Sequence, residues 1–283
     1  MKAQFLLLVQ TVKMALRHNV QDLAATIAFW AFFSIFPLLI GILALTGHFL
    51  QSAELQARVL EALAEFLPGS APLVEENIEA VMNRRGTLSW IAIVGLLWSA
   101  GRGFGAITRA INQTLGAERK YTFLVSAARH FLMAVALSVM VTAAIGIPVV
   151  LEIVLEPSVL AKLGLGELSL PRMRGWALSF VIMFLVFALI YRLAPYVPVG
   201  WRDVLPGALL AAVAFELGKA AFVLYLDRFA HFESVYGPLT SIIVLLLWLY
   251  VSALILILGA EYNIARRQAK EAVAADPQVV NPS

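Results

Sequence analysis

The stretch that decides the fold is residues 239–260, LTSIIVLLLWLYVSALILILGA, in which no residue carries a formal charge. A transmembrane helix needs about 20 predominantly apolar residues to cross a hydrocarbon core about 30 Å thick, and this stretch has 22. Residues 23–50 and 131–151 are equally free of formal charge, over 28 and 21 residues. These three stretches are therefore predicted to be membrane-spanning helices.

Three more apolar stretches of suitable length contain charges. Residues 88–106 hold Arg102 and residues 176–194 hold Arg192, each near one end, where an arginine can extend its side chain to the membrane surface. Residues 204–226 contain Glu216 and Lys219 in their interior. The predicted fold class is all-α: a polytopic membrane protein with six transmembrane helices and short amphipathic interfacial helices.

The composition of all 283 residues agrees with this assignment. Apolar residues make up 61% of the chain and charged residues 14%, whereas soluble domains are roughly half apolar and a quarter charged. The chain has no cysteine, which excludes disulfides, thiolate catalysis and cysteine-based metal sites. Lys and Arg number 21 against 18 Asp and Glu, so no strong field for a polyanion such as nucleic acid is indicated.

Three regions are expected along the chain. In residues 1–22, apolar side chains recur at helical spacing with two cations alongside, which favours an amphipathic helix on the membrane surface over a frayed, solvated tail; the apolar positions are Phe5, Leu8, Val12 and Leu16, and the cations are Lys13 and Arg17. Residues 23–267 form the membrane domain, with two short amphipathic helices expected within 51–87. Residues 268–283 are predicted to be a disordered tail. The apolar run at the start is too short for a cleavable signal peptide.

The distribution of basic residues predicts the orientation. Six spans place 13 Lys and Arg residues on the side that holds both termini and eight on the other side, which also receives most acids. Cytoplasmic loops carry the excess of basic residues. Both termini are therefore expected in the cytoplasm.

Four segments resemble the hallmarks of the YihY/BrkB membrane protein family, whose members were once labelled ribonuclease BN. They are AATIAFW (24–30) running on to SIFP (34–37), LWSAGRGF (97–104) running on to Asn112, WRDVLPG (201–207), and YGPL (236–239) running through LLWLY (246–250) to GAE (259–261). The resemblance covers 23–267. It implies a six-span bacterial inner-membrane protein with both ends inside, and no established activity.

Catalysis is not expected. Hydrolysis of a phosphodiester needs a carboxylate or histidine cluster that binds metal, or a paired acid and base, and the four histidines are scattered over different segments. The motifs HExxH and GxSxG are both missing from the sequence. The sequence therefore predicts no catalytic residue, no metal site and no cofactor.

Glu216 and Lys219 form the candidate polar site inside the membrane. Glu216 lies near the middle of its predicted span, and Lys219 follows three residues later on the same helical face. One interpretation is a polar pathway in which Glu216 binds a proton or cation. The alternatives are a salt bridge turned into the bundle, or a lysine that extends outward beside a protonated glutamate.

Four arginines form a candidate site for an anionic headgroup at the cytoplasmic face: Arg102, Arg109, Arg192 and Arg202. The guanidinium group suits lipid phosphate, although the same residues can simply anchor the helices on the positive-inside side. Gly101 and Gly105 around Arg102 have the GxxxG spacing that permits close helix packing.

Two further features concern helix shape and the last span. Ser34 and Pro37 can kink the first span, for packing or for gating. Glu261, at the end of the last span, is expected to form an ion pair with the nearby Arg266.

Three functions remain open. The leading hypothesis is an integral membrane protein, not an enzyme, that handles or transports a lipid-like or amphiphilic component of the envelope. The alternatives are a structural scaffold and an ion or small-solute carrier that uses Glu216. Expected partners are membrane lipids, with envelope proteins or further copies of the chain as additional candidates and no nucleic acid.

Overall fold

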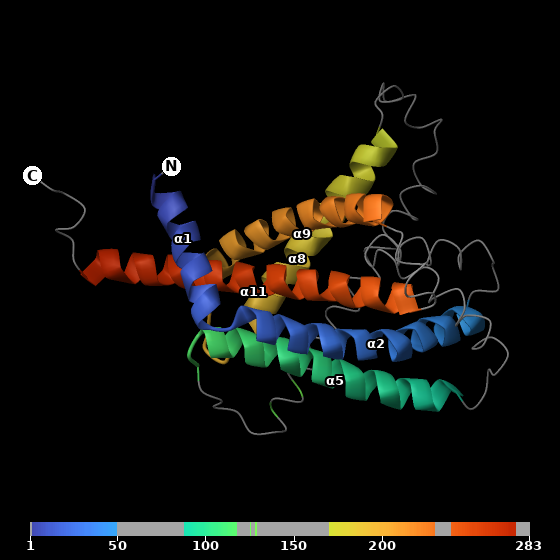
Figure 1. Cartoon of the computed structure of the whole chain (residues 1–283). Coiled ribbons are helices and arrows are strands. Elements are labelled where there is room, and N and C mark those ends of the chain that lie inside the picture. Colours follow the sequence, from blue (N-terminus) through green and yellow to red (C-terminus); the bar gives the residue numbers. More distant parts are fainter. Residues whose placement is uncertain are drawn as a thin grey trace, which may run out of the picture.

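The computed structural model describes residues 2–49, 88–117, 125, 128, 170–229 and 239–275, and this part of the chain contains helices and no strands (Figure 1). Its helices are α1 (Lys2–Arg17), α2 (Val20–Phe49), α5 (Leu88–Thr114), α8 (Leu170–Leu193), α9 (Trp201–Phe229) and α11 (Thr240–Ala275). The all-α class is confirmed for these residues. The predicted span 131–151 and the connection 51–87 lie outside the described residues.

Helix α11 is the centre of the arrangement. It packs against α1, α2 and α9 and makes a smaller contact with α5, while α2 packs on α5 and α8 packs on α9. Figure 1 shows α11 running between the α2–α5 pair and the α8–α9 pair. Its buried side chains include Leu245, Trp248 and Ile257, so the last helix forms the core of the described bundle.

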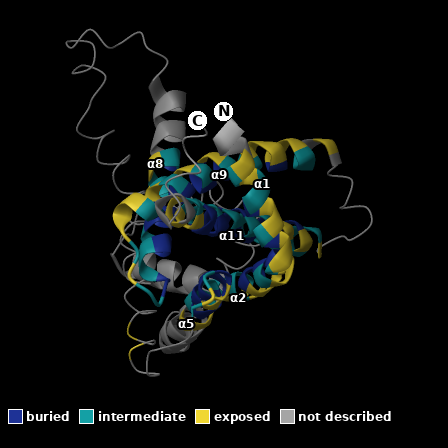
Figure 2. Cartoon of the chain, turned by 90° about the vertical axis from the view of Figure 1, so that its left-hand side faces the viewer, coloured by how far each residue is buried: buried dark blue, intermediate teal, exposed yellow. Residues whose placement is uncertain are grey.

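Helix α9 is apolar on both of its faces. One face buries Ala208, Ala211 and Phe215 against the bundle, whereas Leu209 and Leu217 on the other face are 49% and 66% exposed. Figure 2 shows exposed residues along the outer surfaces of α9 and α1 and buried ones inside. An exposed outer face of this kind needs an apolar environment, which a bilayer provides.

Two helices are long and apolar enough to cross a membrane within the described part of the chain, Trp201–Leu226 and Thr240–Glu271. Shorter apolar stretches occur at Val20–Ser34 and Ser179–Leu193. A membrane protein is therefore supported, and the number of spans stays a prediction.

Helix α5 extends beyond its predicted span. It ends at Thr114, where Gly116 adopts a φ of +60° and the Ala117 N–H donates to the Asn112 carbonyl at 2.9 Å. This backbone pattern terminates helices through a residue that adopts the left-handed region. Arg102 consequently lies 12 residues before the helix end, about 18 Å along the axis. Helix α5 thus continues 8 residues past the predicted span 88–106, because hydropathy does not detect this terminating turn.

Helix α1 forms where the amphipathic pattern predicts it. Thr11 and Ala15 are buried, and α1 contacts α11. The predicted apolar stripe, in contrast, is exposed at Leu8, Val12 and Leu16. Asn19, with a φ of +50°, turns the chain from α1 into α2.

The predicted disordered tail is wrong for residues 268–275, because α11 continues to Ala275. Two residues of this extension form ion pairs with residues outside it: Lys270 Nζ lies 3.2 Å from Asp203 Oδ1, and Glu271 Oε1 lies 2.9 Å from Arg267 Nε. Alanine, lysine and glutamate also favour helix. Residues 276–283 lie outside the described part.

Candidate functional site

Helices α9 and α11 approach each other most closely at Gly207 and Gly259. A Cβ atom built on Gly207 would lie 2.5 Å from the Asn263 Cγ and closer still to the Gly259 carbonyl oxygen. A Cβ on Gly259 would lie 2.9 Å from both the Ala211 Cβ and the Gly207 carbonyl oxygen. Small residues allow such close helix packing in membranes, so both glycines are required by this contact.

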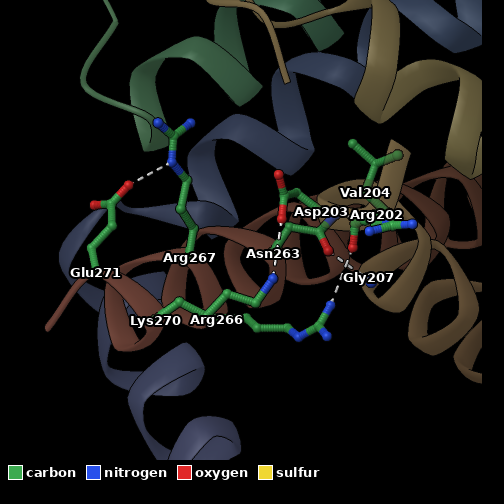
Figure 3. Close-up of polar contacts among 9 residues, drawn as sticks. All are labelled: Arg202, Asp203, Val204, Gly207, Asn263, Arg266, Arg267, Lys270 and Glu271. Atoms are coloured by element: carbon green, nitrogen blue, oxygen red, sulfur yellow. Dashed lines mark hydrogen bonds and ion pairs between the residues drawn. The ribbon is translucent and has the colours of Figure 1, made fainter. Parts of the chain in front are cut away.

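A polar network joins the start of α9 to the last turns of α11 (Figure 3). The Gly207 N–H donates to Asn263 Oδ1 at 2.8 Å, and Asn263 Nδ2 donates to the Val204 carbonyl at 3.2 Å. Pro206 lacks an N–H, so it leaves the Arg202 carbonyl without its usual donor inside the helix. Arg266 Nη1 donates to that carbonyl at 3.4 Å.

The charges at this junction are predominantly positive. Arg202, Arg266, Arg267 and Lys270 contribute four cations, against two anions that Asp203 and Glu271 contribute. The two anions are paired with Lys270 and Arg267, and the side chain of Arg202 is exposed. The junction therefore presents a basic surface that can attract an anionic group.

A small cavity of about 30 Å³ opens beside this network. Its polar lining comes from Asp203, Asn263 and Arg267. Its remaining lining is apolar or aromatic and comes from α5, the end of α8 and the segment that follows it, α9 and α11: Ile111, Leu115, Tyr191, Pro195, Val199, Val204, Ala260 and Ile264. The cavity is thus lined mainly by apolar side chains and includes a few charged and polar ones.

Asn112 fixes one wall of the cavity. Its Nδ2 donates to the Ala194 carbonyl at 2.9 Å and to the Thr108 carbonyl at 2.7 Å, and the Tyr196 N–H donates to its Oδ1 at 2.6 Å. The side chain is buried, so each of these bonds satisfies a group that water does not reach. Asn112 therefore ties the chain after α8 to the end of α5.

The four predicted headgroup arginines do not converge on Arg102. Arg192 donates to the Val199 carbonyl and lies 5.9 Å from the Trp201 ring, next to the cavity wall. Arg102 lies over Trp30 on α2, at 5.4 Å from the ring centroid. It precedes Asn112 by 10 residues, about 15 Å along α5.

The other two arginines of the set are both exposed. Arg109 lies on α5, and Arg202 lies in the first turn of α9. Arg202 is consequently the member of the set that belongs to the α9–α11 junction, and Arg192 on α8 lies beside it, against Val199 and Trp201.

Glu216 and Lys219 face the bundle and meet a residue on α8. Ser179 Oγ donates to Glu216 Oε1 at 2.8 Å, Lys219 Nζ lies 3.0 Å from Glu216 Oε2, and Lys219 Nζ donates to Ser179 Oγ at 3.0 Å. The side chains of Glu216 and Lys219 are 4% and 16% exposed. Of the arrangements considered, this is the salt bridge turned into the bundle, with Ser179 as a member that sequence spacing did not predict.

Glu261 pairs with a residue other than the one expected. Its Oε1 lies 2.6 Å from His18 Nδ1, at the end of α1, and the Glu261 side chain is fully buried. Arg266 contacts the Arg202 carbonyl instead. The expected Glu261–Arg266 ion pair is wrong because Glu261 turns toward α1, whereas Arg266 turns toward α9.

The glycines of α5 differ in how closely they approach α2, the helix that carries the predicted kink residues. A Cβ on Gly101 would meet nothing within 4 Å, whereas one on Gly103 would lie 3.4 Å from Ser34 Oγ. The predicted close packing at Gly101 is therefore wrong, because Gly103 is the residue that faces Ser34 on α2. Gly105 is buried. Ser34 Oγ donates to the Trp30 carbonyl at 2.8 Å, and α2 stays helical through Pro37.

Sequence reasoning missed Asn263, Arg267 and Asp203 as parts of one site. Asp203 and Asn263 lie in or directly beside the family-like segments 201–207 and 259–261, which was the available signal. Within the described residues, no three His, Asp or Glu side chains form a group that could hold a metal ion.

Comparison with known proteins identifies the family. The family Virulence factor BrkB matches residues 11–281. The ribonuclease-like protein YfkH of Bacillus subtilis is 30% identical over 92% of this chain and 94% of its own. A UPF0761 membrane protein of Haemophilus influenzae is 26% identical over 86% of this chain and 88% of its own.

A third relative, a UPF0761 membrane protein of Alkalilimnicola ehrlichii, is 28% identical over 87% of this chain and 56% of its own. No solved structure matches. None of these names states an established activity. The match across nearly the whole chain confirms the resemblance found in the sequence, and the chain belongs to the virulence factor BrkB family of membrane proteins.

Proposed function

We propose that this protein binds an anionic amphiphile of the bacterial envelope, such as a lipid, at the α9–α11 junction and handles or transports it within the membrane. The observation that carries the proposal is the lining of the junction cavity, which combines mainly apolar side chains with Asn263, Arg267 and Asp203, whose carboxylate is paired with Lys270. In this proposal the protein is not an enzyme.

The chemistry of the junction fits a headgroup that carries phosphate or carboxylate. A guanidinium group presents a planar set of donors that matches either anion. Four cations and two anions leave the junction with a formal excess of two positive charges. The apolar wall suits the part of the ligand that joins headgroup to acyl chain.

The size of the cavity limits how the ligand can bind. A volume of about 30 Å³ holds a group on the order of one or two water molecules. We therefore expect a single anionic group to enter it while the rest of the headgroup lies across Arg202 and Arg266. The site is thus proposed around Arg192, Arg202 and Arg267, and not around Arg102.

The proposed setting is the bacterial inner membrane, with several spans and with both termini in the cytoplasm. Arg202, Arg266, Arg267 and Lys270 then face the anionic headgroups of the cytoplasmic leaflet. Positive charge at one end of α9 and α11 supports this orientation.

Native mass spectrometry of protein released gently from membranes tests the proposal. The Arg267→Ala variant removes a cation that lines the cavity, and Glu271→Ala is the matched control because it breaks the same Arg267–Glu271 pair and leaves the cation. We expect retained anionic lipid to fall in Arg267→Ala and to persist in Glu271→Ala. Arg102→Ala should retain it as well.

Two outcomes would contradict this assignment. Equal lipid retention in all variants would indicate annular lipid only and favour a scaffold, for which a stable partner should co-purify. Loss of lipid in Arg102→Ala alone would return the headgroup site to the α2–α5 pair.

A second candidate function, an ion or small-solute carrier, is favoured by the Ser179–Glu216–Lys219 cluster in the middle of α8 and α9. A carboxylate held between helices can exchange its partner for a transported cation. Glu216→Gln should then abolish cation or proton-coupled uptake in proteoliposomes, and unchanged uptake excludes this role.

A further inference from the structure

Helix α1 has an apolar surface that the described part of the protein leaves uncovered. Leu8, Val12 and Leu16 are 46%, 55% and 69% exposed. They follow one another at intervals of four residues and therefore share one side of the helix. On an adjacent side, Thr11 and Ala15 are buried, and α1 contacts α11.

The charge on α1 is entirely positive. Its sequence, KAQFLLLVQTVKMALR, contains Lys2, Lys13 and Arg17 and no acidic residue. Lys13 and Arg17 are exposed and border the apolar stripe. An apolar stripe with cations at its edge is the pattern of a helix that lies in the interface of an anionic membrane.

The contact with α11 fixes the direction in which this stripe faces. His18 Nδ1 and Glu261 Oε1 lie 2.6 Å apart, and the Glu261 side chain has no exposure to solvent. Because Asn19 turns the chain directly into α2, α1 is held at both its side and its end. It therefore cannot rotate to bury the stripe while the His18–Glu261 contact is in place.

We propose that α1 is a lipid-binding surface, whose stripe of Leu8, Val12 and Leu16 inserts into the anionic cytoplasmic leaflet beside α11. Lys13 and Arg17 bind the headgroups at its edge. The charge of α1 selects this occupant over a second copy of the chain, because two α1 helices brought face to face would place like charges together. The inference holds whatever the junction cavity binds.

The same contact links this surface to the cavity. Glu261 lies between Ala260 and Asn263, which both line the cavity. The position of α1 in the leaflet is thereby joined through Glu261 to the helix that forms the cavity wall.

Spin labelling of the full-length protein tests the proposal, since a chain without cysteine accepts single cysteines without background labelling. A nitroxide is placed at Val12→Cys, with Gln10→Cys as the matched control on the other side of α1, about 160° away at 100° per residue. Both proteins are reconstituted into vesicles of phosphatidylcholine and phosphatidylglycerol. Collision rates with oxygen and with a water-soluble nickel chelate report the depth of each label.

We expect the Val12 label to favour oxygen and to lie about 5–10 Å below the phosphates, while the Gln10 label favours the nickel chelate. A label at Leu8→Cys should repeat the Val12 result independently. Replacing Lys13 and Arg17 together by glutamine should make the Val12 label shallower. The control Arg228→Gln, in the last turn of α9, should leave the depth of the label unchanged.

Three results would overturn the proposal. The Val12 and Leu8 labels could both favour the nickel chelate, which would place the stripe in water. Their depth could be the same in vesicles of phosphatidylcholine alone, which would remove the role of anionic lipid. Spin–spin broadening that disappears on dilution with unlabelled protein would show that a second copy covers the stripe.

Discussion

Replacing single glycines by alanine tests the packing of α9 on α11 in graded steps. Three helical glycines differ in the space around them: a Cβ on Gly101 meets nothing within 4 Å, one on Gly218 lies 3.2 Å from Ile255 Cδ1, and one on Gly207 lies 2.5 Å from Asn263 Cγ. The backbone benefit of alanine, roughly 0.5–1 kcal/mol, is shared by all three because each lies inside a helix. Differences between the variants therefore report the contact alone.

The magnitude for Gly207→Ala follows from the overlap. An ordinary contact begins at 3.4 Å, so the new methyl group must gain roughly 0.9 Å from Asn263, and the Gly259 carbonyl behind it belongs to the backbone and cannot turn away. Overpacking of this kind costs typically 1–3 kcal/mol, occasionally more. We expect a net destabilisation of about 2 kcal/mol for Gly207→Ala, near zero for Gly218→Ala, and a slight stabilisation for Gly101→Ala.

Thermal unfolding followed by tryptophan fluorescence is a suitable assay. Trp248 is buried on α11, and its ring lies 5.3 Å from the Phe215 ring and 5.0 Å from the Phe222 ring of α9. A loss of 2 kcal/mol corresponds to a fall in Tm of about 4–8 °C for a chain of this size. Equal Tm values for Gly207→Ala and Gly101→Ala would refute the close packing.

Three further predictions concern buried polar contacts. Lys219→Met should destabilise the protein by about 3–5 kcal/mol, because it leaves the buried Glu216 carboxylate without its cation. Adding Glu216→Leu to this variant should restore most of the lost stability. Stability is measured by SDS titration, and losses that add up in the double variant would contradict the pairing. Asn112→Ala should lower the free energy of unfolding by about 1–3 kcal/mol, because buried groups lose their hydrogen-bond partners. In the same titration, Gln113→Ala, at an exposed position, should change it by no more than about 0.5 kcal/mol. His18→Ala should speed hydrogen exchange in residues 2–17 because α1 loses its contact with Glu261. Exchange no faster than in Lys13→Ala would show that the His18–Glu261 contact does not hold α1 in place.

Helix positions were predictable from the sequence because long uncharged stretches have few other uses. The predicted span 204–226 lies within α9, and all but the first residue of the predicted span 239–260 lies within α11, for this reason. Helix ends were less predictable. The end of α5 depends on Gly116 and a backbone bond to Asn112, and neither affects hydropathy.

Contacts between helices were largely beyond sequence reasoning. The spacing of Glu216 and Lys219 predicted that they share a face, because three residues make almost one turn. Their third member, Ser179, lies on α8 and carries no charge that would mark it. His18 and Glu261 are 243 positions apart, and nothing in their local sequences specifies the register that brings α1 to α11.

The central position of α11 has a consequence for how the protein is assembled during synthesis. The ribosome produces α2, α5, α8 and α9 before α11, so the pairs α2–α5 and α8–α9 can form first. Among the described helices, these two pairs are joined mainly by α11, with a smaller tie from Asn112 on α5 to the chain after α8. A chain interrupted before residue 240 would lack the helix that packs against both pairs, so the surfaces that α11 buries on α2 and α9 would stay uncovered.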